Sequence, residues 1–493
     1  MLGMGNMRQW LMNISLVGGW FPAAAFAVVA VLSVTLLVSA VVSKRDGRIL
    51  ATVLPIGVAA VSGMIGYVVA WLLSDVFVVF GVGLGSRVMA WVAAGFAIAG
   101  FAIAHIVLSR GMMCVAAAIL TVFAILAAAI GIDQLYGEYA TIGSLFGEDS
   151  YSQADLTGLA KRKDLITVAQ WRKQAANGTI RNIPANGTVN KIDIPATKSQ
   201  FEARKALVYL PPAALADSKR KPALPVVLML SGQPGSPGRV FQAGGIQTMM
   251  DGYAKTHDGL APIVIAADQL GADSHNTLCV DSKVYGNALT YLTQDVVDWV
   301  KTNLPAAQDA KDWAIAGFSQ GATCSLQIGV NHPDLFGTMI PTDSEIKPTN
   351  GSRQEMIDRF FDGDTTAYEN QVPVNAIRNH APTHQMLIIG AGEKDTTSIR
   401  NVKTIAPVAA KAGMRVAAVE SSGKRTRLHA VQDVLRYGLA VIRPRHRTGW
   451  CEPEPIRLSE SQNASRYDDP EHKPASLRIP EKERNDSNAN RTC

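Results

Sequence analysis

The sequence is poor in cysteine and in charge for its 493 residues. Its five cysteines include no C-x-x-C pair, which excludes a small disulfide-stapled scaffold and argues against a zinc ribbon or a thioredoxin-like redox motif. Only 18% of the residues are charged, and no basic patch is interleaved with aromatic residues, so we set nucleic-acid partners aside. His, Asp and Glu form no cluster with the spacing of metal ligands, and we expect neither a metal nor another cofactor.

Hydrophobic residues make up 48% of the chain, and they are concentrated near its start. Residues 1–133 contain six Lys or Arg and three Asp or Glu, whereas the other 360 residues carry the remaining 79 charges. Four apolar stretches are long enough to cross a hydrocarbon layer, which takes about 20 helical residues. They cover residues 20–42, 49–73, 87–108 and 112–132. We therefore predict a four-helix transmembrane domain over residues 1–133 that anchors the rest of the chain.

Basic residues in the short loops predict the orientation of this anchor, because Lys and Arg there resist translocation. Loop 43–48 holds three basic residues and loop 109–111 holds one, whereas loop 74–86 has none. The first and third loops are therefore expected to be cytoplasmic. Everything after Asp133 would then lie on the extracytoplasmic side of a cell membrane.

From about residue 190, short β-rich runs alternate with helical stretches, which is typical of an α/β fold with a mainly parallel sheet. The runs cover residues 188–194, 205–210, 225–230, 262–266, 313–316, 337–340, 385–389 and 415–419. We predict one doubly wound domain over residues 188–442. Residues 134–187 are expected to form a polar linker with a short helix around 165–174. Residues 443–493 are expected to be a disordered tail, since few large apolar side chains there can offset the entropy of ordering.

A G-x-S-x-G motif over residues 317–321 is the sharpest chemical signal in the chain. It follows the predicted strand 313–316 directly and precedes a run compatible with a helix. In this context the two glycines permit the strained turn that lifts a serine hydroxyl above the edge of a sheet. Ser319 is therefore the candidate nucleophile.

A serine hydroxyl needs a base to remove its proton, so a histidine is required later in the fold. His332 is placed at the far end of the helix that Ser319 opens, and His380 and His384 flank the starting edge of a predicted strand. His429 follows the last predicted strand, and we take it as the candidate base.

The acid that orients the base should lie between the serine and the histidine, because the chain order in this fold is serine, acid, histidine. Asp395 follows the predicted strand 385–389 and is our choice. Asp343, at the end of the preceding strand, and Glu393 are the alternatives. The acid would hold the imidazole tautomer and stabilise the imidazolium.

Backbone N–H groups must stabilise the negative charge that develops on a carbonyl oxygen during acyl transfer. The residue after the nucleophile, Gln320, should supply one. The loop after the third predicted strand, residues 231–235, should supply the other, and we assign it to Gln233.

With these motifs the sequence resembles the α/β-hydrolase superfamily, and within it the putative esterase family that includes esterase D and the antigen 85 mycolyltransferases. The resemblance covers about residues 190–440. It rests on L-S-G at 230–232, Y-L-T at 291–293, the G-x-S-x-G motif at 317–321 and H-P-D-L-F at 332–336. The arrangement behind a membrane anchor looks like actinobacterial envelope esterases. Many relatives have His-Gly or Asp-Gly where this chain has Ser231-Gly232, a difference that a backbone donor should tolerate.

We therefore expect a membrane-anchored serine esterase that hydrolyses carboxylic esters, with a lipid or glycolipid of the cell envelope as substrate. An acyltransferase that moves the acyl group to a sugar or lipid hydroxyl is the first alternative, and a non-catalytic tethered binding domain is the second. Cys279 and Cys324 could pair in an exported domain, since oxidising compartments permit disulfides, but buried free thiols are also common.

Overall fold

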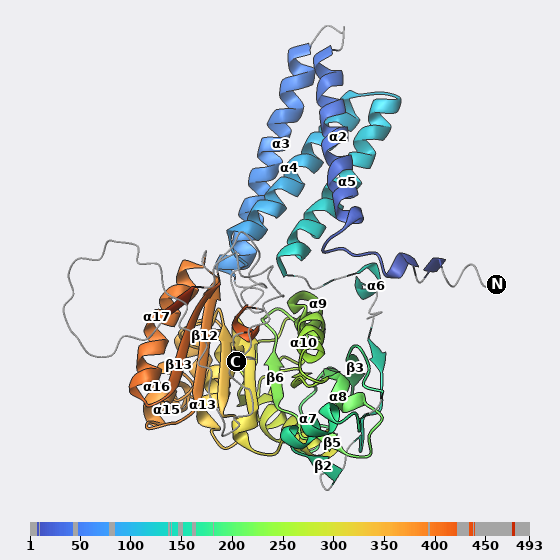
Figure 1. Cartoon of the computed structure of the whole chain (residues 1–493). Helices are drawn as coiled ribbons and strands as arrows, with labels where there is room; N and C mark the ends of the chain where they lie inside the picture. The colour runs from blue at the N-terminus through green and yellow to red at the C-terminus, as the bar shows by residue number, and fades with distance from the viewer. Residues whose placement is uncertain are drawn as a thin grey trace, which may run out of the picture. The chain divides into compact units, whose positions relative to one another are not determined.

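The computed structural model divides into two compact units, Met1–Ser150 and Tyr151–Cys493 (Figure 1). The structure describes residues 7–8, 10–42, 48–77, 84–136, 139, 141–145, 151–159, 164–180, 182–392, 395–421, 433–436, 438 and 476–478.

Four long helices form the first unit: α2 (Trp20–Val42), α3 (Arg48–Trp71), α4 (Ser86–Leu108) and α5 (Met112–Tyr136). All four are long and apolar enough to cross a membrane, and they coincide with the four predicted stretches, so they are candidate membrane spans. Their outward side chains are largely apolar, as for Val107, which is 79% exposed. Glycines lie where the helices meet: a Cβ on Gly95 would come within 2.7 Å of the Ala128 side chain. Small residues of this kind let transmembrane helices approach closely.

The second unit is built on a ten-stranded sheet with the order β1-β3-β4-β7-β6-β10-β11-β12-β13-β14. The strands are β1 (Ser152–Gln153), β3 (Thr188–Ile192), β4 (Ala206–Leu210), β6 (Val226–Leu230), β7 (Ile263–Ala266), β10 (Trp313–Phe318), β11 (Thr338–Thr342), β12 (Met386–Gly392), β13 (Arg415–Ser421) and β14 (Ser476–Arg478). Among the described strands of this sheet, only the β3–β4 and β4–β7 pairs are antiparallel. Each of the eight predicted runs forms a strand, and the mainly parallel α/β fold is confirmed.

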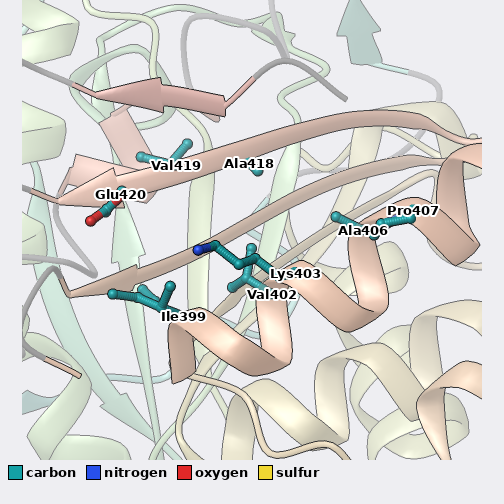
Figure 2. A pocket seen from close by; sticks show the side chains of 9 residues that line it. Ile399, Val402, Lys403, Ala406, Pro407, Ala418, Val419 and Glu420 are labelled. Atoms are coloured by element: carbon teal, nitrogen blue, oxygen red, sulfur yellow. The ribbon is translucent and has the colours of Figure 1, made fainter. Parts of the chain in front are cut away.

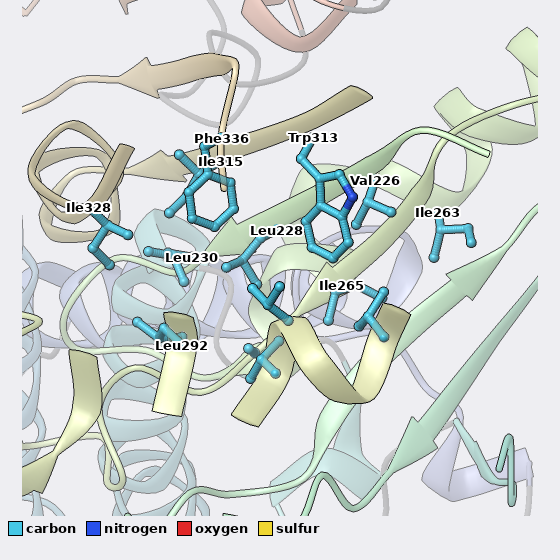
Figure 3. Packing of buried hydrophobic residues seen from close by; sticks show 14 of the residues in the cluster. Val226, Leu228, Leu230, Ile263, Ile265, Leu292, Trp313, Ile315, Ile328 and Phe336 are labelled. Carbon is cyan, nitrogen blue, oxygen red and sulfur yellow. The ribbon is translucent and has the colours of Figure 1, made fainter. Parts of the chain in front are cut away.

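Helices cover both faces of this sheet, because residues alternate between the faces along each strand. Val226, Leu228 and Leu230 face one core (Figure 3). This core also contains side chains of α12 (Val296–Asn303), α13 (Gln320–Asn331) and α17 (Thr396–Lys411). Val227 and Met229 face the other core, with side chains of α9 and α10. The helices are α7 (Val168–Ala176), α8 (Pro212–Leu215), α9 (Pro237–Gly244), α10 (Ile246–Lys255), α11 (Ala288–Thr290), α12 (Val296–Asn303), α13 (Gln320–Asn331), α14 (Arg353–Phe360), α15 (Thr365–Glu369), α16 (Pro373–Asn379) and α17 (Thr396–Lys411).

Of the segment expected to be a linker, the described residues from Tyr151 onward belong to this second unit. Strand β1 pairs with β3, and Thr167 is the N-cap of helix α7 and forms a capping box with Gln170. Trp171 on this helix is completely buried, and its indole N–H donates to the Asp258 carbonyl at 3.0 Å. A buried indole with a paired N–H stabilises this attachment. Of the expected tail, residues 476–478 form strand β14, and the rest lies outside the described residues.

Candidate active site

Ser319 lies between the end of β10 and the first residue of α13. Its backbone has φ 53° and ψ −117°, and its N–H donates to the Thr342 carbonyl at 3.0 Å. A non-glycine residue with positive φ is strained by about 1–3 kcal/mol, and such strain clusters at functional sites. The predicted strand, turn and helix around Ser319 are all present.

The two glycines of the motif leave no room for side chains. A Cβ on Gly317 would lie 2.1 Å from the Gly321 carbonyl oxygen, and a Cβ on Gly321 would lie 2.3 Å from the Ser231 carbonyl oxygen. The turn at Ser319 therefore packs directly on the backbone that follows β6. Each of the two positions therefore requires glycine, because any side chain there would overlap with backbone atoms.

The candidate oxyanion loop lies beside the candidate nucleophile. Strand β6 pairs with β10, and the loop after it starts at Ser231. A Cβ on Gly232 would lie 3.6 Å from the Ser319 Cβ. Gln320 begins helix α13, and the first N–H groups of a helix have no acceptor within the helix. The structure thus brings the Gln233 loop, Gln320 and Ser319 to one place.

The two described candidates for the acid lie near each other at the same edge of the sheet. Asp343 follows β11, is 6% exposed, and accepts the Gly392 N–H at 3.1 Å. Asp395 is the N-cap of α17 and accepts the Ser398 N–H at 3.0 Å. Glu393, the third candidate, lies outside the described residues.

The candidate base His429 also lies outside the described residues. On either side of its segment, Ser421 at the end of β13 donates to the Asp433 carboxylate at 2.6 Å. Of the other histidines, His332 caps the far end of α13, and His380 lies 2.9 Å from the Asn331 side chain at that same end. Both are a helix length from Ser319.

A disulfide joins Cys279 to Cys324, which answers the question that the sequence left open. Cys324 lies on α13, and both residues are buried, at 1% exposed. The bond fastens the loop after β7 to the helix that Ser319 opens.

Glu345, two residues after Asp343, is half-buried near the nucleophile helix. Its N–H donates to Thr323 Oγ1 at 3.0 Å. Burial raises the pKa of its carboxyl to about 7, and a hydrogen bond with Thr349 opposes this shift. Neutral and charged forms of this carboxyl are therefore both populated near neutral pH.

A pocket of about 240 Å³ lies between α17 and the last strands (Figure 2). Apolar side chains dominate its lining, with Lys403 and Glu420 as the charged members. It is close to the carboxyl end of β12 but does not include Ser319.

One buried residue at this edge was not predicted from the sequence. Gln269 follows β7, and its side-chain Nε2 donates to the Ser231 carbonyl at 2.7 Å and lies 3.2 Å from Gln320 Oε1. The signal that could have found it is the polar pair Asp268-Gln269, one residue after the buried strand β7, which pairs with β6.

Residues 198–432 match the family model described as "Putative esterase". An uncharacterized protein of Corynebacterium glutamicum is 32% identical over 333 residues, which is 66% of this chain and 74% of that protein. The chain belongs to the putative esterase family.

Among solved structures, this member of the esterase family is similar to a ferulic acid esterase, with a TM-score of 0.43 and 16% identity over 52% of this chain and 97% of that one. An S-formylglutathione hydrolase from Agrobacterium tumefaciens has a TM-score of 0.41 and 15% identity, over 53% of this chain and 96% of its own. MPT51 of Mycobacterium tuberculosis has a TM-score of 0.36 and 14% identity, over 51% of this chain and 97% of its own. Membership in the esterase family supports an esterase function.

Proposed function

We propose that the chain is a membrane-anchored serine esterase that hydrolyses carboxylic esters of cell-envelope lipids through an acyl-enzyme on Ser319. The observation that carries the proposal is the backbone at Ser319, with φ 53° between two glycines that admit no side chain. That conformation has a cost in stability and presents the hydroxyl at the carboxyl edge of the sheet.

In the proposed mechanism Ser319 Oγ attacks the ester carbonyl while His429 takes its proton. The N–H groups of Gln233 and Gln320 stabilise the oxyanion of the tetrahedral intermediate. The imidazolium returns the proton to the leaving alcohol, and a water activated by the same histidine then hydrolyses the acyl-enzyme. Asp395 orients the imidazole, with Asp343 as the alternative acid.

Chain length is compatible with this role for His429. In the sequence, His429 lies between Ser421 and Asp433 and comes four positions before Asp433. Asp433 is bonded to Ser421 at the end of β13, where Ser421 lies opposite Gly392 of β12. Asp395 follows Gly392 by three residues, so acid and base start from adjacent strand ends.

Two observations support placing the catalytic unit on the extracytoplasmic side. The basic residues of loops 43–48 and 109–111 favour the cytoplasm for those loops. The Cys279–Cys324 disulfide suits an oxidising compartment. An esterase anchored there meets ester lipids and glycolipids at the membrane surface, which is the reason for the proposed substrate class.

Reaction with a fluorophosphonate tests the proposed nucleophile. We expect the full-length chain in detergent to be labelled, and Ser319→Ala to remain unlabelled. Ser325→Ala is the matched control, because Ser325 lies on the same helix and its buried hydroxyl bonds only to the Ala322 carbonyl among the described contacts. A folded wild-type chain without any labelling would favour the tethered binding domain.

Acyl transfer to a sugar or lipid hydroxyl is the alternative use of the same acyl-enzyme. Adding candidate acceptor alcohols to the esterase assay separates the two. Free acid alone as the product supports a hydrolase, and a new ester whose yield rises with acceptor concentration supports a transferase.

A further inference from the structure

We propose that Gln269 is a positioning residue that holds the oxyanion loop and the nucleophile turn in register. The inference rests on the proposed function, because it takes the N–H groups of Gln233 and Gln320 as the oxyanion donors. Gln269 is 0% exposed and lies in the loop after β7, beside both segments that carry these donors.

Three contacts define the position of the Gln269 amide. Nε2 lies 2.7 Å from the Ser231 carbonyl oxygen, 3.3 Å from Ser231 Oγ and 3.2 Å from Gln320 Oε1. Ser231 begins the loop that contains Gln233, and Gln320 is the first residue of α13. One side-chain amide therefore bridges the two segments whose relative position defines the oxyanion hole.

Holding a carbonyl also orients the N–H of the same peptide. In a trans peptide the C=O and N–H point in opposite directions. Gln269 attracts the Ser231 carbonyl, so the Gly232 N–H points away from Gln269 and the turn toward Gln233 starts in a defined direction. The Gln320 side chain is held from a second side, since its Nε2 donates to Asn276 Oδ1 at 3.3 Å.

Gln269 is itself fixed from its own loop. Thr277 Oγ1 donates to the Gln269 carbonyl at 2.7 Å. The preceding residue, Asp268, has a fully buried side chain and pairs with Arg204 at 2.8 Å. The Arg204 guanidinium also donates to the Gly235 carbonyl at 2.9 Å, so the same two residues hold the other end of the oxyanion loop.

Stability alone explains Gln269 poorly. Its Oε1 is buried and has no hydrogen-bond partner within the described part of the chain, and an unpaired buried acceptor is destabilising. Gln385 offers a contrast, because its Nε2 donates to the Gly329 and Phe336 carbonyls at 2.6 and 2.7 Å and its Oε1 accepts from Thr383 at 3.1 Å. A buried amide with an unpaired oxygen lowers stability, and such departures from full hydrogen bonding are expected at functional sites.

The test compares Gln269→Met with Gln385→Met in the purified full-length chain. Each change keeps the side-chain volume and removes a buried amide donor, which has three acceptors in Gln269 and two in Gln385. We measure kcat and KM with a p-nitrophenyl ester, and Tm. Complete loss of one oxyanion donor lowers kcat by about 10²- to 10³-fold, so we expect Gln269→Met to lower kcat about 10- to 100-fold with KM within about twofold. Gln385→Met should lower Tm and leave kcat within about twofold of wild type.

If the wild type is active and folded Gln269→Met has the same kcat, the role proposed for Gln269 is wrong, and the proposed esterase function is unaffected. A wild type that neither hydrolyses the ester nor reacts with a fluorophosphonate overturns the proposed function instead. If Gln269→Met does not fold, Gln269→Glu tests the proposal instead. A neutral carboxyl at this position can donate to the Ser231 carbonyl, and a carboxylate cannot. Its kcat relative to wild type should fall from about pH 6 to about pH 9, the range in which buried glutamates titrate. A constant ratio near one contradicts the proposal.

Discussion

Cys324 is joined to Cys279 by a disulfide and lies five residues after Ser319 on helix α13. The nucleophile helix is thus covalently tied to the loop that carries Gln269. Because the two cysteines are 45 residues apart, the bond closes a long loop in the unfolded chain.

We predict that Cys279→Ser with Cys324→Ser lowers the free energy of unfolding by up to about 4 kcal/mol, the loop-entropy value for this separation. Thermal unfolding of the full-length chain with and without a reductant measures it. Cys114→Ser is the control, since Cys114 is a free cysteine of the first unit. A Tm that neither reductant nor the double substitution lowers would contradict the stabilising role.

Gly321→Ala should abolish most activity. The added methyl group would lie 2.3 Å from the Ser231 carbonyl oxygen, so either the nucleophile turn or the oxyanion loop must move by about an ångström. Displacements of about 1 Å can cost about 100-fold in rate. Gly252→Ala on α10, where a Cβ meets nothing within 4 Å, should leave kcat unchanged and raise stability by about 0.5–1 kcal/mol. Equal kcat values in the two variants would show that the close packing at Gly321 does not matter for catalysis.

Asparagine substitutions distinguish the two candidate acids. Asp395→Asn should lower kcat by about 10³- to 10⁴-fold, because an amide supports the wrong imidazole tautomer. The cap on α17 should survive, since the Asn side-chain oxygen can still accept the Ser398 N–H. Asp343→Asn should lower kcat by less than about tenfold, the effect of weakening its charge-assisted bond to the Gly392 N–H. The opposite ranking would transfer the role of acid to Asp343.

Glu345 should make stability depend on pH. Burial raises the pKa of its carboxyl in the folded chain to about 7, from an ordinary value of 4.5. The folded state therefore binds the proton more tightly than the unfolded state, and the stability contributed by the neutral form is lost as pH rises from 4.5 to about 7. Glu345→Gln should remove this loss, which is at most about 3 kcal/mol.

The measurement is Tm at pH 5 and at pH 8 for wild type, Glu345→Gln and Glu355→Gln. We expect the advantage of Glu345→Gln over wild type to be larger at pH 8. Glu355 is an exposed carboxylate of α14, so its substitution should change Tm little at either pH. Parallel pH profiles for wild type and Glu345→Gln would contradict the prediction.

Reporter fusions test the orientation of the anchor. Alkaline phosphatase needs an oxidising compartment, so a fusion after residue 137 should be active and a fusion at residue 46 inactive. A cytoplasmic reporter such as β-galactosidase should give the reverse pattern. Activity of the phosphatase at residue 46 would invert the proposed topology.

Local patterns were sufficient for much of this architecture. The four long apolar helices follow from runs of apolar residues. Strands such as β6 and β7 were predictable because a parallel strand covered on both faces is a continuous apolar segment. The turn at Ser319 was also predictable, because the motif that forms it is local. The strand, the turn and the helix are consecutive in the sequence, and the two glycines lie within two residues of the serine.

Contacts between distant segments were decided only by the tertiary structure. From the sequence, Trp171 is expected in a polar linker. In the structure it is buried, and its indole N–H donates to the Asp258 carbonyl. The pairing of Cys279 with Cys324 and the contact of Gln269 with Ser231 both join segments about 40 residues apart, 45 and 38 respectively. Hydropathy and local propensity contain no information on such partners, because each contact forms only once the sheet brings its strand ends together at one edge.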